Sequence, residues 1–445
     1  MTTEGAATST STLDAANAAP TERPIAAKRE GTLAGLLDNT AFRRLWAAQL
    51  LAQLGEAVAL VAMPLLVYAL TGSAELLSLI FVLQLAPRVL LAPIAGMVVD
   101  RFDRKRLIIA ADLARAGLVL LLPFATSAWQ VAVVATFVAI GNTISRPAEL
   151  AALPMVVPPN QLVPAMAAAQ VAGSVVRIIG PVLAAGIVAF AGPGPAFMVQ
   201  AVCFVLSAII LTRMSLPPVT RQGDPDEAKS ALRREIVDGI RIVAHNPIVR
   251  GTALVEALWQ LVSAGMVVAL LVYVEQMRNL DGDSSSVYSF LIATLAAGMA
   301  VGSLVARPVE RGIGRPLLMG IGYLAPLMLI SASLRPPLPV LFACWFILGF
   351  TDAWAVIAMQ TYLAEAVPDG LRGRAYAGWT GVVTFGAAIA FTIVGQLTPR
   401  LGPSTTLGLI GFIVGFGGPI LLLVTGAFRA IRVHSTGGLT QTANG

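Results

Sequence analysis

The stretch Gly96-Met-Val-Val-Asp100-Arg101-Phe-Asp103-Arg104-Lys105-Arg106 decides the fold of this chain. It joins two long apolar stretches, 75–99 and 107–124, and it carries six charged side chains. Such a cluster is too costly to place in hydrocarbon, so it is predicted to form a tight turn at a membrane surface. Its four bases predict that this surface is the cytoplasmic one.

Composition agrees with a membrane protein along the whole chain. The 445 residues are 57% hydrophobic and 12% charged, whereas a soluble domain has about 25% charged residues. Cys203 and Cys344 lie in apolar stretches of different halves, which favours packing over a disulfide or a metal site. The sequence has no G-K-[ST] phosphate loop, HExxH, CxxC or G-x-S-x-G motif. We therefore expect no enzyme, cofactor, metal or nucleic-acid partner.

Apolar stretches recur along the chain, and each is long enough to cross a bilayer as a helix, which takes about 20 residues. They predict an all-α protein of about twelve transmembrane helices. The approximate limits are 42–70, 75–99, 106–126, 129–146, 161–191, 195–212, 249–276, 285–306, 315–333, 338–361, 373–398 and 403–428.

The distribution of bases predicts that both termini are cytoplasmic. With that topology, 24 of the 30 Lys and Arg residues fall in cytoplasmic segments and three in the opposite loops. The expected divisions are a disordered tail over 1–38, a six-helix bundle over 39–212, a linker over 213–248, a second six-helix bundle over 249–430, and a tail over 431–445. Within the linker, residues 226–244 read as an amphipathic helix on the inner leaflet.

An internal repeat supports two related bundles. Val157-Pro-Pro-Asn-Gln-Leu-Val-Pro-Ala-Met-Ala167 reappears 210 residues later as Val367-Pro-Asp-Gly-Leu-Arg-Gly-Arg-Ala-Tyr-Ala377. Self-similarity at this distance is typical of transporters built from parallel repeats. The second copy of the charged turn, Gly302-Ser-Leu-Val-Ala306-Arg307, lacks the aspartate.

The charged turn resembles the signature between the second and third helices of the major facilitator superfamily. Asp103, where many members carry glycine, resembles its drug and siderophore exporters. Phe42-Arg-Arg-Leu-Trp46, Gln53-Leu-Gly-Glu56 and Arg146-Pro-Ala-Glu-Leu-Ala-Ala-Leu-Pro154 are most similar to the enterobactin-exporter and macrolide-efflux branch, which includes drug–proton antiporters. The resemblance implies a central cavity lined by the first, second, fourth and fifth helices of each half.

Polar residues follow single faces of these helices. Span one carries Gln49, Gln53 and Glu56 at i, i+4 and i+7, and span seven repeats the spacing. Polar stripes confined to these helices indicate a wet path. The candidate cavity residues are Gln49, Gln53, Gln84, Arg88, Asn142, Gln170, Ser174, Arg177, Gln260, Ser263, Thr380 and Thr384.

Three acids are candidates for proton coupling: Glu56, Glu256 and Asp352. Glu56 is the first choice, because a carboxylate in a partly dry cavity is suited to binding and releasing a proton. The alternative is that Glu56 forms a permanent ion pair with Arg88 or Arg177. Glu256 and Asp352 are equally candidates for contact with substrate. Asp112 and Arg115, three residues apart, are expected to pair locally.

Span five contains Gly173, Gly180, Pro181 and Gly186, a pattern similar to the Gly-Pro motif of proton-coupled exporters. Glycines permit close helix contact, and proline removes a backbone hydrogen bond and lets a helix bend. The strict motif ends in two glycines where this chain has Ala184 and Ala185, and the same pattern also occurs in ordinary membrane helices.

The resemblance also implies a conformational switch in the charged turn. Asp100 is expected near Gly373 and Arg374 at the start of span eleven, with the helix dipole favouring the contact. Gly96, Arg101, Arg104, Lys105 and Arg106 complete this switch. The alternative is a static topology anchor.

These observations predict a monomeric exporter in the bacterial inner membrane that moves amphipathic drugs or siderophore-like compounds by proton antiport through alternating access. Its expected partners are substrate, protons and lipids. The alternatives are an uptake permease for a small metabolite and a non-transporting receptor on the same fold. The acids favour cationic substrates and Arg88 with Arg177 favours anionic ones, so the sequence leaves the substrate charge open.

Overall fold

The structure is a computed structural model that describes residues 33–158, 161–214, 237–277, 284–368 and 371–427. Within these ranges it is helical and contains no strand. The first half consists of α2 (Leu33–Asp38), α3 (Thr40–Thr71), α4 (Ala74–Leu90), α5 (Ala92–Arg101), α6 (Arg104–Val119), η1 (Leu122–Phe124), α7 (Ala128–Val156), α8 (Leu162–Ala191) and α9 (Pro193–Thr212).

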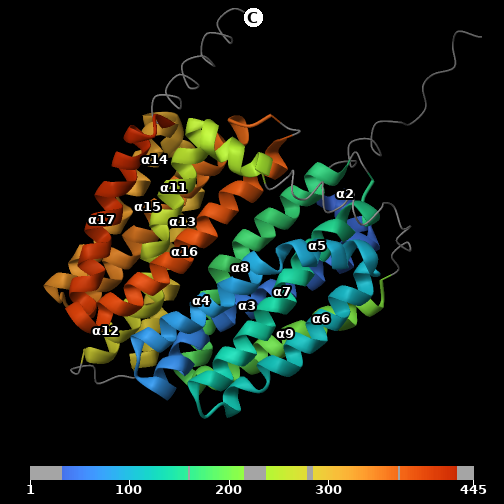
Figure 1. Ribbon diagram of the computed structural model, residues 1–445, viewed down its shortest axis with the longest axis horizontal. Coiled ribbons are helices and arrows are strands. Elements are labelled where there is room, and N and C mark those ends of the chain that lie inside the picture. The colour runs from blue at the N-terminus through green and yellow to red at the C-terminus, as the bar shows by residue number, and fades with distance from the viewer. Residues whose placement is uncertain (1–32, 159–160, 215–236, 278–283, 369–370, 428–445) are drawn as a thin grey trace, which may run out of the picture.

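The second half consists of α11 (Pro247–Ala264), η3 (Gly265–Ala269), α12 (Leu270–Gln276), α13 (Ser284–Ile313), α14 (Arg315–Tyr323), η4 (Ala325–Leu334), α15 (Leu338–Glu365), α16 (Arg372–Leu401) and α17 (Pro403–Val424). The two halves form two helix bundles that lie side by side (Figure 1). Between the bundles, α8 packs on α13 and α4 packs on α16.

Eleven helices in the described ranges are long and apolar enough to cross a membrane. The predicted second span is absent from this set because it is divided at Leu91 into α4 and α5. Pro87 lies in the last turn of α4, and Pro93 lies in the first turn of α5. Proline lacks the N–H that a continuous helix would need, which explains the division. Counting α4 with α5 as one span gives the predicted twelve.

The structure differs from the predicted divisions of the chain in two segments, the N-terminal tail and the linker. The tail expected to be disordered over 1–38 ends in helix α2, whose Leu36 is buried in the first bundle. In the predicted linker, residues 237–245 are helical and Val243 packs with Val249 and Ala375 of the second bundle. This segment therefore packs on protein, and the rest of the predicted amphipathic helix lies outside the described residues.

The first helix of each bundle begins with the same cap. Asn39 and Asn246 each accept hydrogen bonds from two backbone N–H groups of α3 and α11. Each also donates from Nδ2 to a carbonyl at the end of a distant helix, Asn39 to Val156 at 2.7 Å and Asn246 to Ala366 at 3.0 Å. The structure thus repeats at an interval of 207 residues at these caps.

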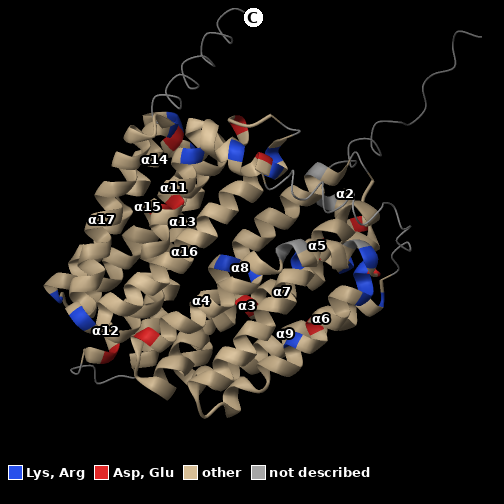
Figure 2. Ribbon diagram, in the orientation of Figure 1, with Lys and Arg blue, Asp and Glu red and all other residues tan. Residues whose placement is uncertain are grey.

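The bundles meet at one end and separate at the other. We define the basic end as the end that carries the α5–α6 turn and the caps of α3 and α11, where Lys and Arg gather in Figure 2. We call the opposite end the far end. One hydrophobic core runs through both bundles and includes Leu77 and Val188 of the first and Leu291 and Phe391 of the second. Toward the basic end, two further cores each belong to a single bundle.

Exposure along single helix faces confirms this asymmetry. On α16, Gly373 and Thr380 are exposed, whereas Ala387 and Val394, seven and fourteen residues beyond Thr380, are buried. Residues seven apart lie on nearly the same helix face. The face that packs on the first bundle at the far end is therefore uncovered at the basic end. We call the space between these uncovered faces the basic-end cleft.

Candidate functional site

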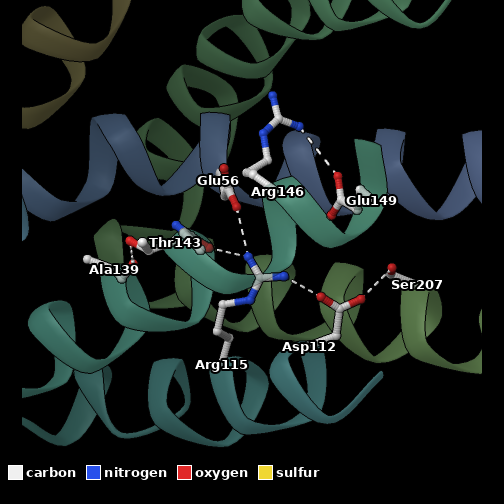
Figure 3. A network of polar contacts seen from close by, with 9 residues as sticks. Glu56, Asp112, Arg115, Ala139, Thr143, Arg146, Glu149 and Ser207 are labelled. Atoms are coloured by element: carbon white, nitrogen blue, oxygen red, sulfur yellow. Dashed lines mark hydrogen bonds and ion pairs between the residues drawn. The ribbon is translucent and has the colours of Figure 1, made fainter. Parts of the chain in front are cut away.

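The most extensive polar network in the described membrane spans centres on Arg115 of α6 (Figure 3). Arg115 donates from Nη1 to Oε1 of Glu56 on α3 at 3.0 Å and also to Oδ1 of Asn142 on α7. Its Nη2 donates to Asp112 one helical turn away. Ser207 of α9 donates to the other oxygen of Asp112 at 2.6 Å. The guanidinium and the Asp112 carboxylate that it binds thus join four helices of the first bundle.

The Arg115 side chain is buried and closely packed by its neighbours. Its side chain is 2% exposed, and its guanidinium carbon lies 4.3 Å from the centre of the Phe204 ring, a cation–π contact. Gly141 gives it room, because a Cβ at that position would lie 2.8 Å from Cγ of Arg115. An arginine held by acids on two helices stabilises the bundle only as long as all its partners remain.

Glu56 is the charged member of the network that is partly exposed at the protein surface. Its side chain is 33% exposed, whereas Asp112 is 0% exposed. The alternative prediction of an ion pair for Glu56 therefore has a structural counterpart, but the partner is Arg115 and not Arg88 or Arg177. The expected local pair of Asp112 and Arg115 forms, and it is part of this larger network.

A second ion pair lies near the network. Arg146 and Glu149, one turn apart on α7, approach to 3.5 Å, and Figure 3 shows them beside Glu56. The Arg146 side chain is 55% exposed and that of Glu149 is buried. Arg177 of α8 is also exposed. The first bundle thus presents two exposed arginines on neighbouring cavity helices.

The acids of the second bundle are arranged differently. Glu256 of α11 and Asp352 of α15 are partly exposed. The ring of Tyr323 on α14 contacts the ring of Trp259 on α11 edge-on, with centroids 6.3 Å apart. Within the described residues, neither acid has an ion-pair or hydrogen-bond partner. This bundle therefore holds two uncompensated carboxylates.

None of the twelve predicted cavity residues is buried. Several bond within their own helix: Ser174 donates to the Gln170 carbonyl at 3.0 Å, and Arg177 donates to Ser174 at 2.9 Å. Thr384 and Gln84 likewise donate to the carbonyl four residues earlier. On α8, Gln170 and Arg177 are exposed on the face that is buried at Ala184. By the same periodicity as on α16, these two side chains face the basic-end cleft.

The predicted switch residues are anchored within their own bundles. Arg104 donates to the Ala151 carbonyl at 2.9 Å, and Lys105 donates to the Thr212 carbonyl at 2.9 Å. Cations at helix C-termini are favoured by the helix dipole. Arg374 pairs with Asp238 of the linker helix at 2.9 Å. The side chain of Asp100 lies outside the described part of the structure, so the predicted contact with α16 remains a prediction.

The remaining switch residues are at the surface, since Gly96, Arg101, Arg106 and Gly373 are all exposed. The backbone N–H of Arg106 donates a hydrogen bond to Oδ1 of Asp103 at 2.8 Å. Asp103 is the N-cap of α6, which accounts locally for the acid between the bases of the turn.

The glycines of the Gly-Pro pattern have different surroundings. Gly173 faces Gln53, whose Oε1 would lie 2.8 Å from an added Cβ, and a Cβ at Gly180 would overlap Ala57. These two glycines let α8 lie close to α3. Gly186 has nothing within 4 Å of such a Cβ. Pro181 is buried within the continuous helix α8.

Sequence reasoning assigned no role to Glu149 or Tyr323 and gave Arg115 only a local one. A signal for Arg115 existed in the sequence. Gly141 directly precedes Asn142, so span four offers a space beside a hydrogen-bonding amide. No comparable signal marks Tyr323, because its surroundings come from helices distant in sequence.

The fold and these intramembrane polar sites are those of a multi-span transporter, and comparison with known proteins identifies the family. The model of the Major Facilitator Superfamily matches residues 45–337 and 282–438. The chain belongs to this superfamily. It is a transporter rather than an enzyme, and it is a multi-pass protein of the bacterial inner membrane.

Similar curated proteins include an exporter. The enterobactin exporter EntS of Escherichia coli O1:K1 is 25% identical over 412 residues, which cover 89% of this chain and 94% of EntS. The uncharacterized MFS-type transporter YfiS of Bacillus subtilis is 22% identical over 399 residues, covering 85% and 92%.

Solved structures share the fold. The nucleoside transporter NupG superposes with a TM-score of 0.68 at 12% identity and covers 87% of this chain and 99% of its own. A bacterial homologue of the iron transporter ferroportin, in an inward-facing state, superposes with a TM-score of 0.65 at 14% identity and covers 88% and 99%.

Proposed function

We propose that this protein exports amphipathic small molecules, of the drug or siderophore-like kind, by proton antiport through alternating access. Outward transport is supported by the similarity to an enterobactin exporter along most of both chains. With the termini on the cytoplasmic side, as the bases predict, the basic-end cleft opens to the cytoplasm, where an exporter loads its substrate. The partners are the substrate, protons and the surrounding lipids, and the protein acts as a monomer.

The observation that carries proton coupling is the uncompensated pair Glu256 and Asp352. A charge at membrane depth costs about 2.5–3.5 kcal/mol even on the lenient insertion scales, so two acids without a base imply a function. A proton neutralises either one, and so does a cation. Glu56 is already held by Arg115, so we place the coupling primarily on the second-bundle acids. Glu56 is then a secondary carrier.

The charged turn is proposed to close the basic end. In the present arrangement its bases bind carbonyls of their own bundle, and Arg374 binds Asp238. Approach of the bundles would bring the end of α5, with Asp100, toward the first turn of α16. The helix dipole there favours an acid.

Proton release in proteoliposomes tests the proposal. Purified protein is reconstituted with a pH-sensitive dye inside the vesicles, and cationic dyes, macrolides and catecholates are added separately. We expect substrate-dependent proton movement opposite to substrate, lost in Glu256→Gln and Asp352→Asn. The matched control is Glu275→Gln, an exposed acid at the end of α12 in the same bundle.

Glu56→Gln separates the two assignments of the carrier. Coupling that survives in Glu56→Gln and disappears in the second-bundle variants supports the assignment above. Coupling lost only in Glu56→Gln would move it to the first bundle. If protons move in the same direction as substrate, the protein is an uptake permease. If no substrate moves protons, proton antiport is wrong.

A further inference from the structure

Each bundle begins with a short helix that precedes its first membrane span, and the two short helices make equivalent contacts. In the first bundle this helix is α2, and in the second it is the linker helix over residues 237–245. Three pairs of residues, each 207 positions apart, have matching roles: Leu36 and Val243, Asn39 and Asn246, and Arg43 and Arg250. The members of the first pair are buried, and those of the second cap the following helix. Each arginine donates from Nη1 to the carbonyl six residues before it, at 3.2 and 3.0 Å. The linker helix is therefore part of the structural repeat and more than a tether.

Both short helices pack near the start of the fifth span of their own bundle. Leu36 belongs to a buried cluster with Ala165 in the first turn of α8. Val243 belongs to a buried cluster with Ala375 in the first turn of α16, 210 residues after Ala165. These two spans are the ones whose faces are uncovered at the basic-end cleft. Each short helix therefore supports a helix that lines the cleft.

The linker helix is fixed to α16 by an ion pair and by contact between backbones. Nη1 of Arg374 donates to Oδ2 of Asp238 at 2.9 Å. A Cβ added at Gly239 would lie 2.7 Å from the carbonyl oxygen of Arg374, and one added at Gly378 would lie 2.6 Å from the carbonyl oxygen of Gly239. The absence of side chains at both glycines thus lets the two helices cross in direct contact. We expect the linker helix and the first two turns of α16 to move together as long as these contacts hold.

The linker helix lies on the side of α16 that faces away from the cleft. Thr380 is on the uncovered face, and Gly378, two residues before it, contacts the linker helix. Two residues correspond to a rotation of about 200° in a helix of 3.6 residues per turn, so these positions point in nearly opposite directions. The linker helix also leads directly into Asn246, the cap of α11. It therefore ties the start of α16 to α11 and away from the first bundle.

The first turn of α16 is also where the charged turn is proposed to act when the basic end closes. Arg374 lies beside the exposed Gly373 in that turn, and its side chain is 42% exposed, so it is accessible from outside the second bundle. The helix dipole disfavours a base at a helix N-terminus, so Arg374 is stabilised by an acid beside it. In the present arrangement that acid is Asp238. An acid of the charged turn would approach from the cleft side, so the two acids compete for one guanidinium.

We propose that the linker helix is a brace that holds the start of α16 away from the first bundle, and that Arg374 must leave Asp238 for the basic end to close. Asp238 is then a positioning residue, which acts through Arg374. This inference rests on the alternating access of the proposed function, but it is independent of the substrate, of the direction of transport and of proton coupling. It assigns to the linker a part in setting the balance between the open and closed states of the basic end.

Pulsed electron resonance on the purified full-length protein tests the brace without transport. Spin labels at positions 150 on α7 and 313 on α13, both exposed toward the basic end, report the distance between the bundles. We expect Asp238→Asn to raise the ratio of closed to open populations about two- to fivefold, the range for loss of a partly exposed ion pair. Gly239→Ala should shift the ratio in the same direction, because the added Cβ overlaps the Arg374 carbonyl.

Two controls separate the ion pair from a folding defect. The exchanged pair, Asp238→Arg combined with Arg374→Asp, restores the attraction and should return the ratio toward the wild-type value, which a folding defect would not. Asp38→Asn removes an exposed acid from the end of α2, the equivalent helix of the first bundle, and should leave the ratio unchanged.

The outcomes separate this inference from the proposed function. A ratio that is unchanged in Asp238→Asn, or that shifts toward the open state, overturns the brace, and so does a shift that the exchanged pair fails to reverse. The proton measurements in vesicles would then still decide antiport. A shift toward the closed state that the exchanged pair reverses supports the brace, even if no substrate moves protons and antiport fails.

Discussion

Replacement of Arg115 by methionine should be the most destabilising charge removal in the first bundle. Methionine is similar in length and leaves the apolar contact with Phe204, but it removes every hydrogen bond that the guanidinium donates. Asp112, which is 0% exposed, then keeps only the hydrogen bond from Ser207. Loss of one partner from a buried ion pair typically costs about 3–5 kcal/mol.

We expect a loss in this range for Arg115→Met, measured as the free energy of unfolding of the purified protein in mixed micelles titrated with SDS. Asp112→Asn combined with Arg115→Met should recover most of it, because the uncompensated charge is gone and the acceptor for Ser207 remains. Arg400→Gln, an exposed charge at the far end, should change stability by less than about 1 kcal/mol. An Arg115→Met variant as stable as Arg400→Gln would refute the network.

Three further changes test the packing and the symmetry. Gly302→Ala should destabilise the second bundle by about 1–3 kcal/mol, because the new Cβ overlaps the Phe350 carbonyl oxygen. Asn246→Ala should cost about 1–2 kcal/mol, because it removes the cap of α11 and the tie to α15; SDS unfolding measures both. Phe391→Ala removes the stack with Phe81 at 5.0 Å that joins the bundles, and it should shift the population toward far-end opening about two- to tenfold.

Matched variants keep these outcomes interpretable. Gly381→Ala should be neutral or stabilising, since nothing lies within 4 Å of its Cβ and alanine favours helix. The population in Phe391→Ala is read by pulsed electron resonance between spin labels at positions 75 and 400, both exposed at the far end. Equal destabilisation by Gly302→Ala and Gly381→Ala would contradict the close packing of α13 on α15, and an unchanged label distance would contradict the far-end contact.

Much of the fold could be predicted because its signals are local. The number of spans follows from runs of apolar residues as long as the bilayer is thick, and eleven of the twelve form helices of membrane length. The exception, at Leu91, depends on how the chain accommodates two prolines, which length and hydropathy do not show. The structural similarity of the two halves could be predicted from the 210-residue repeat, although the matching helix caps Asn39 and Asn246 were not recognised.

The candidate site could be predicted only in part. Helical spacing indicated which residues share a face, and the predicted cavity residues are all at least partly exposed. It did not indicate the partner of Glu56, because Arg115 is 59 positions away on another helix. The sequence ranked Glu56 first among the three acids, but a count of three acids against two arginines could not decide the charge of the substrate.

By itself the sequence determined the membrane location, the family and the depth at which each charge lies, because these depend on composition, on motifs and on distance along one helix. Tertiary structure decided which of those charges is compensated. Glu56 is neutralised by an arginine that approaches across the bundle, whereas Glu256 and Asp352 have no such partner among the described residues. Compensation depends on contact between helices distant in sequence, and the interaction of two charges depends on their separation in space.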